Sequence, residues 1–372
     1  MVKRRTLLEA GAAVALGGSL WRRAVRAEPG GAGYGGLSEP DELGIRLPEG
    51  FTSRLIGQSK VEVAGTGYAW HGGPDGGACF AHGEGWIYVS NAELEAGEGG
   101  VSAVRFGADG SILDAYAVLS GTERNCAGGA TPWRTWLSCE ETAFGAVYET
   151  DPYGGTTAVR RDAMGRFRHE AAAADPDRYV VYLTEDEPDG CFYRFVPDSW
   201  GDLGSGRLQL LGGDDDRPEW IEVPDPSGGT TPTRHQVEGA RHFDGGEGCH
   251  YAAGVCYFTT KGDNRVWAYD AAANGLRVLY GGDGPLSGVD NLTGTAGGDL
   301  FVAEDGGNME ICVISTDGEV TPFLRVTGQG GSELCGVAFN PAGDRLYFSS
   351  QRGIADDLYD GRTYEVTGPF RA

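Results

Sequence analysis

Short apolar runs recur along the chain, and each one ends in a small or hydroxyl-bearing residue followed by polar or acidic residues. The six runs occupy residues 86–93, 135–141, 180–186, 255–264, 300–305 and 346–352. The residues just before the polar ends (Ser90, Ser138, Thr184, Thr260, Ala303 and Ser350) are separated by 48, 46, 76, 43 and 47 positions. Blades of β-propellers repeat about every 40–50 residues. The pattern therefore predicts an all-β protein, a six-bladed β-propeller in which one interval carries an insertion.

The segments between these runs predict further strands and the limits of the domain. Apolar segments follow most of the runs, at residues 101–106, 191–196, 265–270, 309–315 and 363–368. Gly, Asp and Pro separate the segments, as expected for the turns of hairpins. These turn residues are dense around 197–232, where we expect the insertion. A pair of β-sandwiches is an alternative, but the sustained period favours one propeller over residues 60–372, preceded by an N-terminal extension at 28–59.

The N-terminus has the composition of an export signal. Lys3, Arg4 and Arg5 precede a short, mildly apolar run at 11–20 and small residues at 24–27. This order is typical of a cleavable signal, and adjacent arginines fit the twin-arginine class. A membrane anchor is the alternative, but a span needs roughly 18 or more apolar residues. We therefore predict a twin-arginine signal peptide at residues 1–27 and a monomer, periplasmic or secreted, that uses the twin-arginine export machinery and has no stable membrane association.

Charge and cysteine content narrow the function further. The net charge of −24 argues against nucleic acid as a partner, because phosphate backbones repel such a surface. The same charge fits calcium binding or simply a solvated acidic surface. Four of the eight cysteines, at 139, 191, 312 and 335, lie in or beside apolar runs and are expected to be buried. Cys249 and Cys256 could form a disulfide, and Cys126 differs from the rest in its polar surroundings.

Polar motifs upstream of the runs predict a site in the central channel. These motifs, at 71–73, 125–129, 237–241, 289–292 and 333–336, stand where inner strands begin, which is the channel mouth of a propeller. Cys126 precedes Glu140 by 14 residues and Asp290 precedes Glu304 by the same number. That spacing suits two strands and a turn, which would return both polar ends to one face.

The result is a predicted funnel of anionic groups around one axis. Facing carboxylates cannot all stay ionised without cations, and hard oxygen ligands suit Ca²⁺ or Mg²⁺. A thiolate at Cys126 would add affinity for iron or zinc. The alternative is that the acids only cap strand ends and meet solvent. The predicted metal ligands are Cys126, Glu140, Glu141, Glu185, Asp186, Glu238, Asp290, Asn291, Glu304, Asp305 and Glu333.

Several blocks in this order resemble the PhoX-type alkaline phosphatases. They lie at 125–141, 182–187, 193–197, 237–241, 289–292, 302–307, 333–351 and 367–370, over nearly the whole mature chain. The resemblance implies a six-bladed propeller that holds ferric and calcium ions around a bridging oxo group and hydrolyses phosphate esters.

Carried over by position, the resemblance assigns Cys126 as an iron ligand and Glu238 as an acidic metal ligand. Glu140 or Glu141 matches the ligand of the Cys-Glu-Glu motif. The metal-facing residues that it implies in the later blades are Asp290, Asn291, Glu304 and Glu333.

The chain departs from the family pattern at one position that concerns phosphate binding. Some members have Arg-Pro-Glu where this sequence has Gln236, Val237 and Glu238, so an arginine that would hold the phosphate is missing. Arg134, Arg241, Lys261 and Arg352 lie at blade ends and could substitute, or they are plain surface charges. The expected catalytic residues are Cys126, Glu238, Arg241, Lys261 and Arg352.

Three functions are compatible with this sequence. The leading hypothesis is a metal-dependent phosphatase that uses Ca²⁺ and Fe³⁺ to hydrolyse a small phosphorylated substrate. The alternatives are a calcium-dependent lactonase or esterase, and a non-catalytic binding propeller in which metals only add rigidity. Cys126 favours the first, because a calcium-only site has no use for a thiolate. The missing arginine favours the other two.

Overall fold

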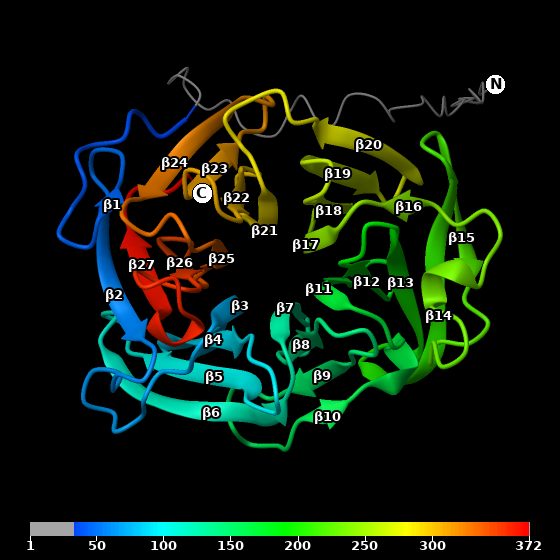
Figure 1. Ribbon diagram of the computed structural model, residues 1–372, viewed down its shortest axis with the longest axis horizontal. Helices are drawn as coiled ribbons and strands as arrows, with labels where there is room; N and C mark the ends of the chain where they lie inside the picture. Colours follow the sequence, from blue (N-terminus) through cyan, green and yellow to red (C-terminus); the bar gives the residue numbers. More distant parts are fainter. Residues whose placement is uncertain (1–32, 372) are drawn as a thin grey trace, which may run out of the picture. The chain divides into compact units, whose positions relative to one another are not determined.

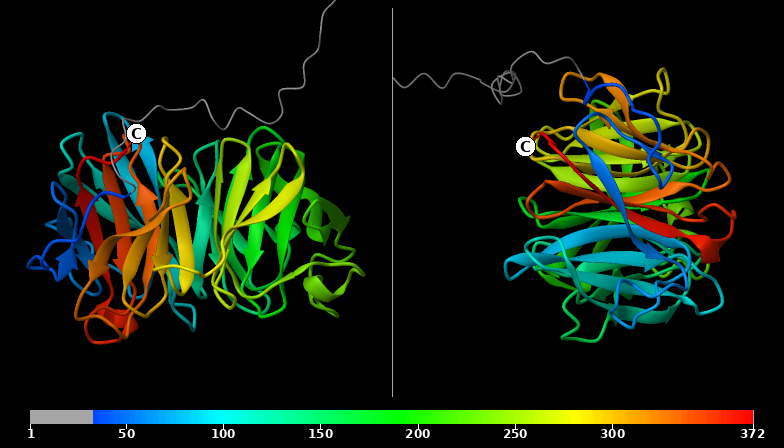
Figure 2. Two further views of the ribbon diagram at one scale, coloured as in Figure 1. Left: turned by 90° about the horizontal axis from the view of Figure 1, so that it is seen from above. Right: turned by 90° about the vertical axis from the view of Figure 1, so that its left-hand side faces the viewer.

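Residues 33–371, which the computed structural model describes, form six antiparallel sheets arranged around one axis (Figure 1). This confirms the predicted six-bladed β-propeller. Figure 2 shows the ring from the side, with the strands running across its thickness. The predicted signal peptide, residues 1–27, lies outside the described residues. Within 33–371, no helix is long and apolar enough to cross a membrane.

Three of the blades are regular four-stranded sheets, in which each strand pairs with the next along the chain. The first contains β3 (Pro74–His82), β4 (Gly85–Ala92), β5 (Gly99–Phe106) and β6 (Ile112–Thr122). The second contains β7 (Asn125–Ala130), β8 (Trp136–Glu140), β9 (Val147–Thr150) and β10 (Val159–Arg160). The fourth contains β17 (Gly246–Ala252), β18 (Val255–Thr260), β19 (Arg265–Asp270) and β20 (Gly275–Tyr280).

The third blade is the largest and has six strands. It contains β11 (His169–Asp175), β12 (Val180–Glu185), β13 (Gly190–Ser199), β14 (Asp202–Asp214), β15 (Arg217–Glu222) and the short β16 (His242–Phe243). Residues 197–232 build the end of β13, the long β14–β15 hairpin and the connection that follows it. The described helices are short 3₁₀ turns, namely η2 (Asp162–Met164), η3 (Thr233–His235) and η4 (Leu358–Asp360).

The last two blades each include a strand from the N-terminal part of the chain. The fifth contains β21 (Val289–Gly294), β22 (Leu300–Glu304), β23 (Glu310–Ile314) and β24 (Val320–Val326), extended by β1 (Ile45–Arg46). The sixth contains β25 (Leu334–Phe339), β26 (Arg345–Ser350) and β27 (Arg362–Thr367), and its outermost strand is β2 (Thr52–Gln58).

The predicted limit of the propeller at residue 60 is therefore wrong. β2 pairs with β27 from Thr52 opposite Thr367 to Gln58 opposite Arg362. This pairing closes the ring with backbone hydrogen bonds between the two ends of the chain, and it leaves no unpaired edge on β27. Segment 45–58 thus belongs to the domain and not to an extension before it.

Apolar side chains from the alternating strands fill the spaces between neighbouring blades. Tyr88 of the first blade stacks on Tyr347 of the sixth at a centroid distance of 4.7 Å. Phe192 of the third stacks on Phe258 of the fourth at 4.2 Å. All four rings are fully or almost fully buried. The core is thus a series of contacts between blades, which holds their inner strands in a fixed ring.

Small residues let the inner strands approach closely where they surround the axis. A Cβ atom at Gly76 would lie 2.5 Å from Cα of Ala127, and one at Gly248 would lie 2.7 Å from the backbone nitrogen of Leu292. Gly336 has φ +66°, and a Cβ there would lie 2.4 Å from the carbonyl oxygen of Asp75. Only glycine fits such contacts between backbones. The narrow ring brings side chains from different blades within ligand distance of one another.

All eight cysteines lie within the described residues and are free. The Sγ atoms of Cys249 and Cys256 are 3.4 Å apart in the core between the third and fourth blades, without a bond between them. The disulfide that the sequence left open is not formed in this structure. Cys126 is half-buried, and its thiol takes part in no disulfide.

Candidate functional site

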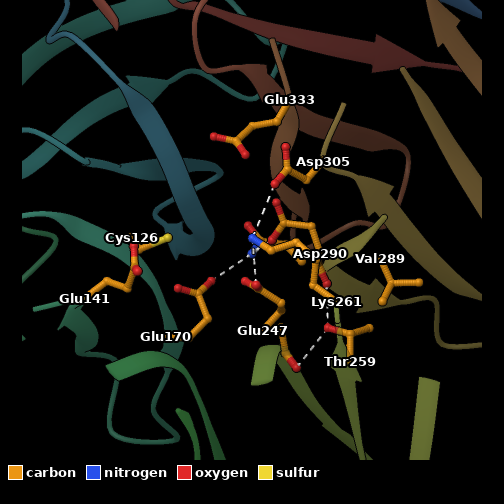
Figure 3. A network of polar contacts seen from close by, with 12 residues as sticks. Cys126, Glu141, Glu170, Glu247, Thr259, Lys261, Val289, Asp290, Asp305 and Glu333 are labelled. Atoms are coloured by element: carbon orange, nitrogen blue, oxygen red, sulfur yellow. Dashed lines mark hydrogen bonds and ion pairs between the residues drawn. The ribbon is translucent and has the colours of Figure 1, made fainter. Parts of the chain in front are cut away.

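Five of the six inner strands present a carboxylate or a thiol to the channel at the same position. In each of these blades, the inner strand begins with a residue that pairs with the second strand, and the side chain in question belongs to the next residue. These next residues are Asp75, Cys126, Glu170, Glu247 and Asp290. In each of these pairs the register shifts at this point, as in a β-bulge. A bulge bends the strand and changes the direction of its side chains. Figure 3 shows four of the five side chains converging from different blades.

The converging side chains form three overlapping groups of candidate metal ligands. The groups are Asp75–Glu93–Cys126, Cys126–Glu141–Glu170 and Glu170–Glu247–Asp290, and within each group the ligand atoms lie within 4.8 Å of one another. Cys126 and Glu170 each belong to two groups, so the ligands form a continuous arc.

The carboxylates of this arc have free capacity for a cation. Oδ1 of Asp75 and Oε2 of Glu170 are buried and have no hydrogen-bond partner among the described residues. Several carboxylate oxygens within reach of one point suit Ca²⁺, and the thiol adds a ligand suited to iron. The residues present therefore fit the calcium and iron that the sequence predicts.

Amide side chains hold the ligands in position. Asn291 donates from Nδ2 to Oδ1 of Asp290 at 2.8 Å and to Oε1 of Glu170 at 3.3 Å. Gln351 donates from Nε2 to Oδ2 of Asp75 at 2.7 Å and also to Glu93 at 2.6 Å. Because Asn291 reaches Glu170 and Gln351 reaches Asp75 and Glu93 from other blades, these contacts orient the carboxylates relative to one another. The predicted residue Asn291 thus lies at the site, buried beside the acids.

Successive acids at the ends of the second strands point in opposite directions. Glu141, Asp186 and Asp305 line the channel cavity, together with Asp290 and Glu333. Side chains alternate between the two faces of a strand. The acids that directly precede Glu141, Asp186 and Asp305 therefore face into their own blades. The structure thus brings five predicted acids and Cys126 together at the channel.

The prediction that Glu140, Glu185 and Glu304 belong to the channel site is wrong. Glu140 accepts two backbone N–H groups at 3.1 Å, from residues 17 positions before it and six positions after it. Glu304 accepts N–H groups from the same relative positions at 2.8 and 3.0 Å. Glu185 accepts the Tyr193 hydroxyl at 2.8 Å and pairs with Arg234 at 2.9 Å. These glutamates satisfy backbone and side-chain donors inside the blades. They cap strand ends, as in the alternative, but they are buried and do not meet solvent.

Two of the predicted cations lie at the channel. Nζ of Lys261 is 2.7 Å from Oε1 of Glu247 and 3.3 Å from Oδ2 of Asp305. Nη1 of Arg352 is 3.0 Å from Oε1 of Glu333. Both side chains line the cavity and bridge acids of neighbouring blades.

Two further cations line the cavity and were not predicted. Nη2 of Arg124 is 2.7 Å from Glu93 and 2.6 Å from Glu141. Arg168 pairs with Glu141 at 3.2 Å and approaches Glu187 at 3.7 Å. Each arginine lies just before an inner-strand ligand, Arg124 before Cys126 and Arg168 before Glu170. Two further guanidinium groups thus lie in the channel cavity.

Glu238 and Arg241 lie away from the channel, contrary to the predictions made for them. Arg134 also lies outside the cavity lining, which fits the plain surface charge that was its alternative. Glu238 is exposed in the connection between η3 and β16. Arg241 pairs with Asp215 and covers the ring of Trp267 at 5.3 Å. Arg134, in the turn between β7 and β8, donates to the carbonyl group of Ala81 and stacks on the ring of Tyr153. The motif at 237–241 precedes the inner strand by several residues, so its side chains are not part of the ring.

The acids that sequence reasoning missed are Asp75, Glu93, Glu170 and Glu247. The 14-residue spacing that joins Cys126 to Glu140 could have identified two of them. Glu170 precedes Glu185 by 15 residues, and Glu247 precedes Thr260 by 13. Extending the spacing to every blade would have pointed to both, although Thr260 is not acidic.

The cavity at the channel mouth carries a large excess of negative charge. Its volume is about 670 Å³, and ten carboxylates but only four cationic side chains line it. Burial, and then the neighbouring carboxylates, raise the pKa of Asp75, Glu170 and Glu333 well above their usual range. Burial and the nearby Asp75 likewise raise the pKa of the Cys126 thiol. Without cations these groups retain protons, and bound cations would replace the protons.

The stability of the metal-free protein should therefore fall as the pH rises. The unfolded chain releases carboxyl protons near pH 4, whereas the folded metal-free protein keeps those of Asp75, Glu170 and Glu333 at higher pH. The unfolded state thus binds fewer protons, and the free energy of unfolding decreases with increasing pH.

Thermal unfolding measures this dependence. After chelator treatment, we expect a lower Tm at pH 8 than at pH 5.5. Excess Ca²⁺ should remove or reverse the difference, and Glu170→Gln should weaken it in the chelated protein. A chelated protein that gains stability over this range would contradict the assignment of the buried protons.

Fold and site together define a six-bladed β-propeller with an anionic channel cluster that contains one thiol. The chain belongs to the alkaline phosphatase PhoX family, whose model matches residues 96–146 and 142–283. The matched residues include Cys126, Glu141, Glu170 and Glu247 of the ligand arc, and Lys261 beside it.

Solved structures share the propeller architecture at low sequence identity. A gluconolactonase from Xanthomonas campestris is 14% identical, with a TM-score of 0.50, and the match covers 86% of this chain and 98% of that one. A protein of unknown function from Bacteroides thetaiotaomicron is 10% identical, with a TM-score of 0.54, covering 85% and 76% of the two chains. These similarities concern the fold alone. No match is found among curated protein sequences.

Proposed function

We propose that this protein is a metal-dependent phosphatase that hydrolyses phosphate monoesters at the mouth of the propeller channel. The observation that carries the proposal is the arc of overlapping ligand groups that share Cys126 and Glu170. Membership of the alkaline phosphatase PhoX family supports the reaction class.

The arc offers two kinds of ligand for two kinds of metal ion. Asp75, Glu141, Glu170, Glu247 and Asp290 supply carboxylate oxygens, which suit Ca²⁺. Cys126 supplies a sulfur ligand, which suits iron and does not suit calcium. When bound, such ions would polarise the phosphoryl oxygens and offset the charge of the transferring group.

The cationic side chains would bind and orient the phosphate. Arg124 and Arg352 both line the cavity, where they pair with Glu93 and Glu333, and Lys261 lies near the third ligand group. Guanidinium groups form paired hydrogen bonds with phosphate oxygens and stabilise charge on the transferring group. All three cations are paired with carboxylates of the cavity. Metal ions bound to those carboxylates would weaken these ion pairs and leave the guanidinium and ammonium groups free for the substrate.

Hydrolysis of p-nitrophenyl phosphate by the purified protein tests this proposal. We expect activity that is highest at alkaline pH, is lost after chelation and returns with Ca²⁺, and we expect iron in the purified protein by elemental analysis. Cys126→Ala should remove most of the iron and lower the rate at least about tenfold. Cys79→Ala is the matched control, because Cys79 lies within β3, four residues after Asp75, and outside the ligand groups.

A different outcome would favour one of the alternatives. Hydrolysis of lactones or carboxylic esters by a calcium-only protein, with phosphomonoesters untouched, would support the lactonase or esterase. Calcium binding without any hydrolysis would support a binding propeller. The thiol inside the ligand arc is the observation that makes us prefer the phosphatase.

The cellular setting proposed with this function comes from the sequence. We propose that the protein is exported by the twin-arginine machinery, acts outside the cytoplasm as a monomer, and binds neither nucleic acid nor the membrane. Export of a folded, metal-loaded protein would suit a site assembled from all six blades.

A further inference from the structure

The cavity at the channel mouth has one apolar side. Leu94, Ala96, Leu358 and Tyr359 line it, and apart from these four and Cys126 its described lining consists of charged residues and one glutamine. The four residues, which we call the apolar wall, come from the β4–β5 connection and from the segment between β26 and β27. The wall therefore belongs to the first and sixth blades, next to the Asp75–Glu93–Cys126 ligand group.

Backbone hydrogen bonds fix the wall relative to the ligands. The carbonyl group of Leu358 accepts the N–H of Gly73 at 2.6 Å, and the carbonyl group of Gly73 accepts the N–H of Glu93 at 2.8 Å. The next residue, Leu94, accepts the N–H of Arg124 at 2.7 Å. A continuous series of bonds thus joins the wall to one ligand and to one phosphate-binding candidate.

The ring of Tyr359 is held in place from several sides. Nζ of Lys60 lies 3.8 Å from the ring centroid, and the hydroxyl group donates to Glu98. A Cβ at position 72 would lie 2.8 Å from Cδ1 of the ring, so Gly72 allows the ring to pack against the backbone. The side chain of Asp357 accepts the N–H of Tyr359 at 2.8 Å. Since 39% of Tyr359 is still exposed, the ring offers a preformed apolar surface at the mouth.

The charges beside the wall restrict what can bind there. Glu95 and Glu98 lie on the same side of the cavity, and the Glu95 side chain is 80% exposed. They would repel a second anionic group on the part of a substrate that lies against the wall. An uncharged aromatic or aliphatic group meets no such repulsion and gains contact with Leu94, Leu358 and Tyr359.

We propose that the apolar wall selects phosphate monoesters of apolar, uncharged alcohols, aryl phosphates above all, over esters whose alcohol part carries negative charge. The proposal rests on the proposed function, because a phosphate held by Arg124 would have its ester oxygen directed toward the wall. Tyr359 is in this view a specificity-determining residue that contacts the leaving group.

Binding of two phosphonates that are not hydrolysed tests the proposal separately from catalysis. Phenylphosphonate and methylphosphonate carry the same anionic group and differ only in the part that would touch the wall. Calorimetry on the metal-loaded protein should show tighter binding of phenylphosphonate. Tyr359→Ala should reduce this preference about three- to tenfold, which is the range expected for one aromatic contact. Tyr359→Phe should retain the preference, because it keeps the ring.

The ratio of the two affinities is insensitive to the folded fraction of a variant, since both ligands bind the same folded protein. Tyr179→Ala, which removes an exposed tyrosine in the third blade, is the matched control and should leave the ratio unchanged. No preference in the natural protein, or an equal preference in Tyr359→Ala, would overturn the inference. Failure of the metal-loaded protein to bind either phosphonate would instead overturn the proposed function, and the inference with it.

Discussion

Replacing Glu170 by glutamine should lower phosphatase activity at least about 100-fold. Even the loss of a residue that only hydrogen-bonds to a metal ligand lowers metal affinity or activity about 10- to 100-fold. Glu170 is buried and belongs to two of the three overlapping ligand groups, so the substitution weakens two candidate ion positions at once. Glutamine keeps the size of the side chain but removes its charge. We expect a lower metal content by elemental analysis and a loss of rate that excess Ca²⁺ does not fully restore.

The matched control is Glu140→Gln. Glu140 accepts two backbone N–H groups within its blade, and glutamine can accept only one of them well. One donor left without a partner should cost about 1–3 kcal/mol of unfolding free energy. Metal content and the rate per folded molecule should be unchanged. If Glu140→Gln lost its metals while Glu170→Gln kept them, the assignment of the two glutamates would be reversed.

Replacing Glu185 by alanine should destabilise the protein by about 3–5 kcal/mol, the usual cost of removing one partner of a buried ion pair. The carboxylate is fully buried, pairs with Arg234 at 2.9 Å and accepts the Tyr193 hydroxyl at 2.8 Å. It also accepts the N–H of Cys191 at 3.0 Å. Without it, the backbone N–H loses its side-chain acceptor, while the guanidinium group keeps only Asp189 at 2.9 Å and Glu187 at 3.6 Å, and the hydroxyl keeps only Thr233 at 2.9 Å. Urea unfolding, followed by tryptophan fluorescence, gives the free-energy change.

Glu187→Ala provides the comparison for this substitution. Glu187 lies 3.6 Å from Arg234 and is partly exposed, so its loss should cost less than about 1 kcal/mol. Metal content should be normal in both variants at a temperature where they are folded. A stable Glu185→Ala variant with a low metal content would show that Glu185 binds metal and that the structural role assigned to it is wrong.

The architecture could be predicted because each blade is a local unit. Strands that pair within a blade are neighbours in the sequence, so apolar runs and turns repeat at the blade period. Glu141, Asp186 and Asp305 could be predicted as channel acids for the same reason, because each lies at the end of an apolar run that forms the second strand of its blade. Cys126 was found because its polar, glycine-rich surroundings differ from those of the buried cysteines.

Contacts between distant segments could not be predicted in this way. The N-terminal strand β2 completes the last blade more than 300 residues away, and no local pattern near Thr52 indicates its partner. The sequence points to Glu238 and not to Glu247, because the long connection in the third blade places an acidic motif before the true inner strand. Length and composition do not reveal where such a connection ends.

The sequence by itself determined that this is a six-bladed propeller with acids and one thiol near its channel. The tertiary structure decided which of two successive acids, Glu140 or Glu141, faces the axis. Side chains alternate along a strand, so a shift of one residue exchanges the channel face for the blade face. The bulges that place Asp75, Glu170 and Glu247 in the ring exist only when the inner strands are paired with their neighbours. The direction of each side chain is therefore a property of the closed ring and not of the local sequence.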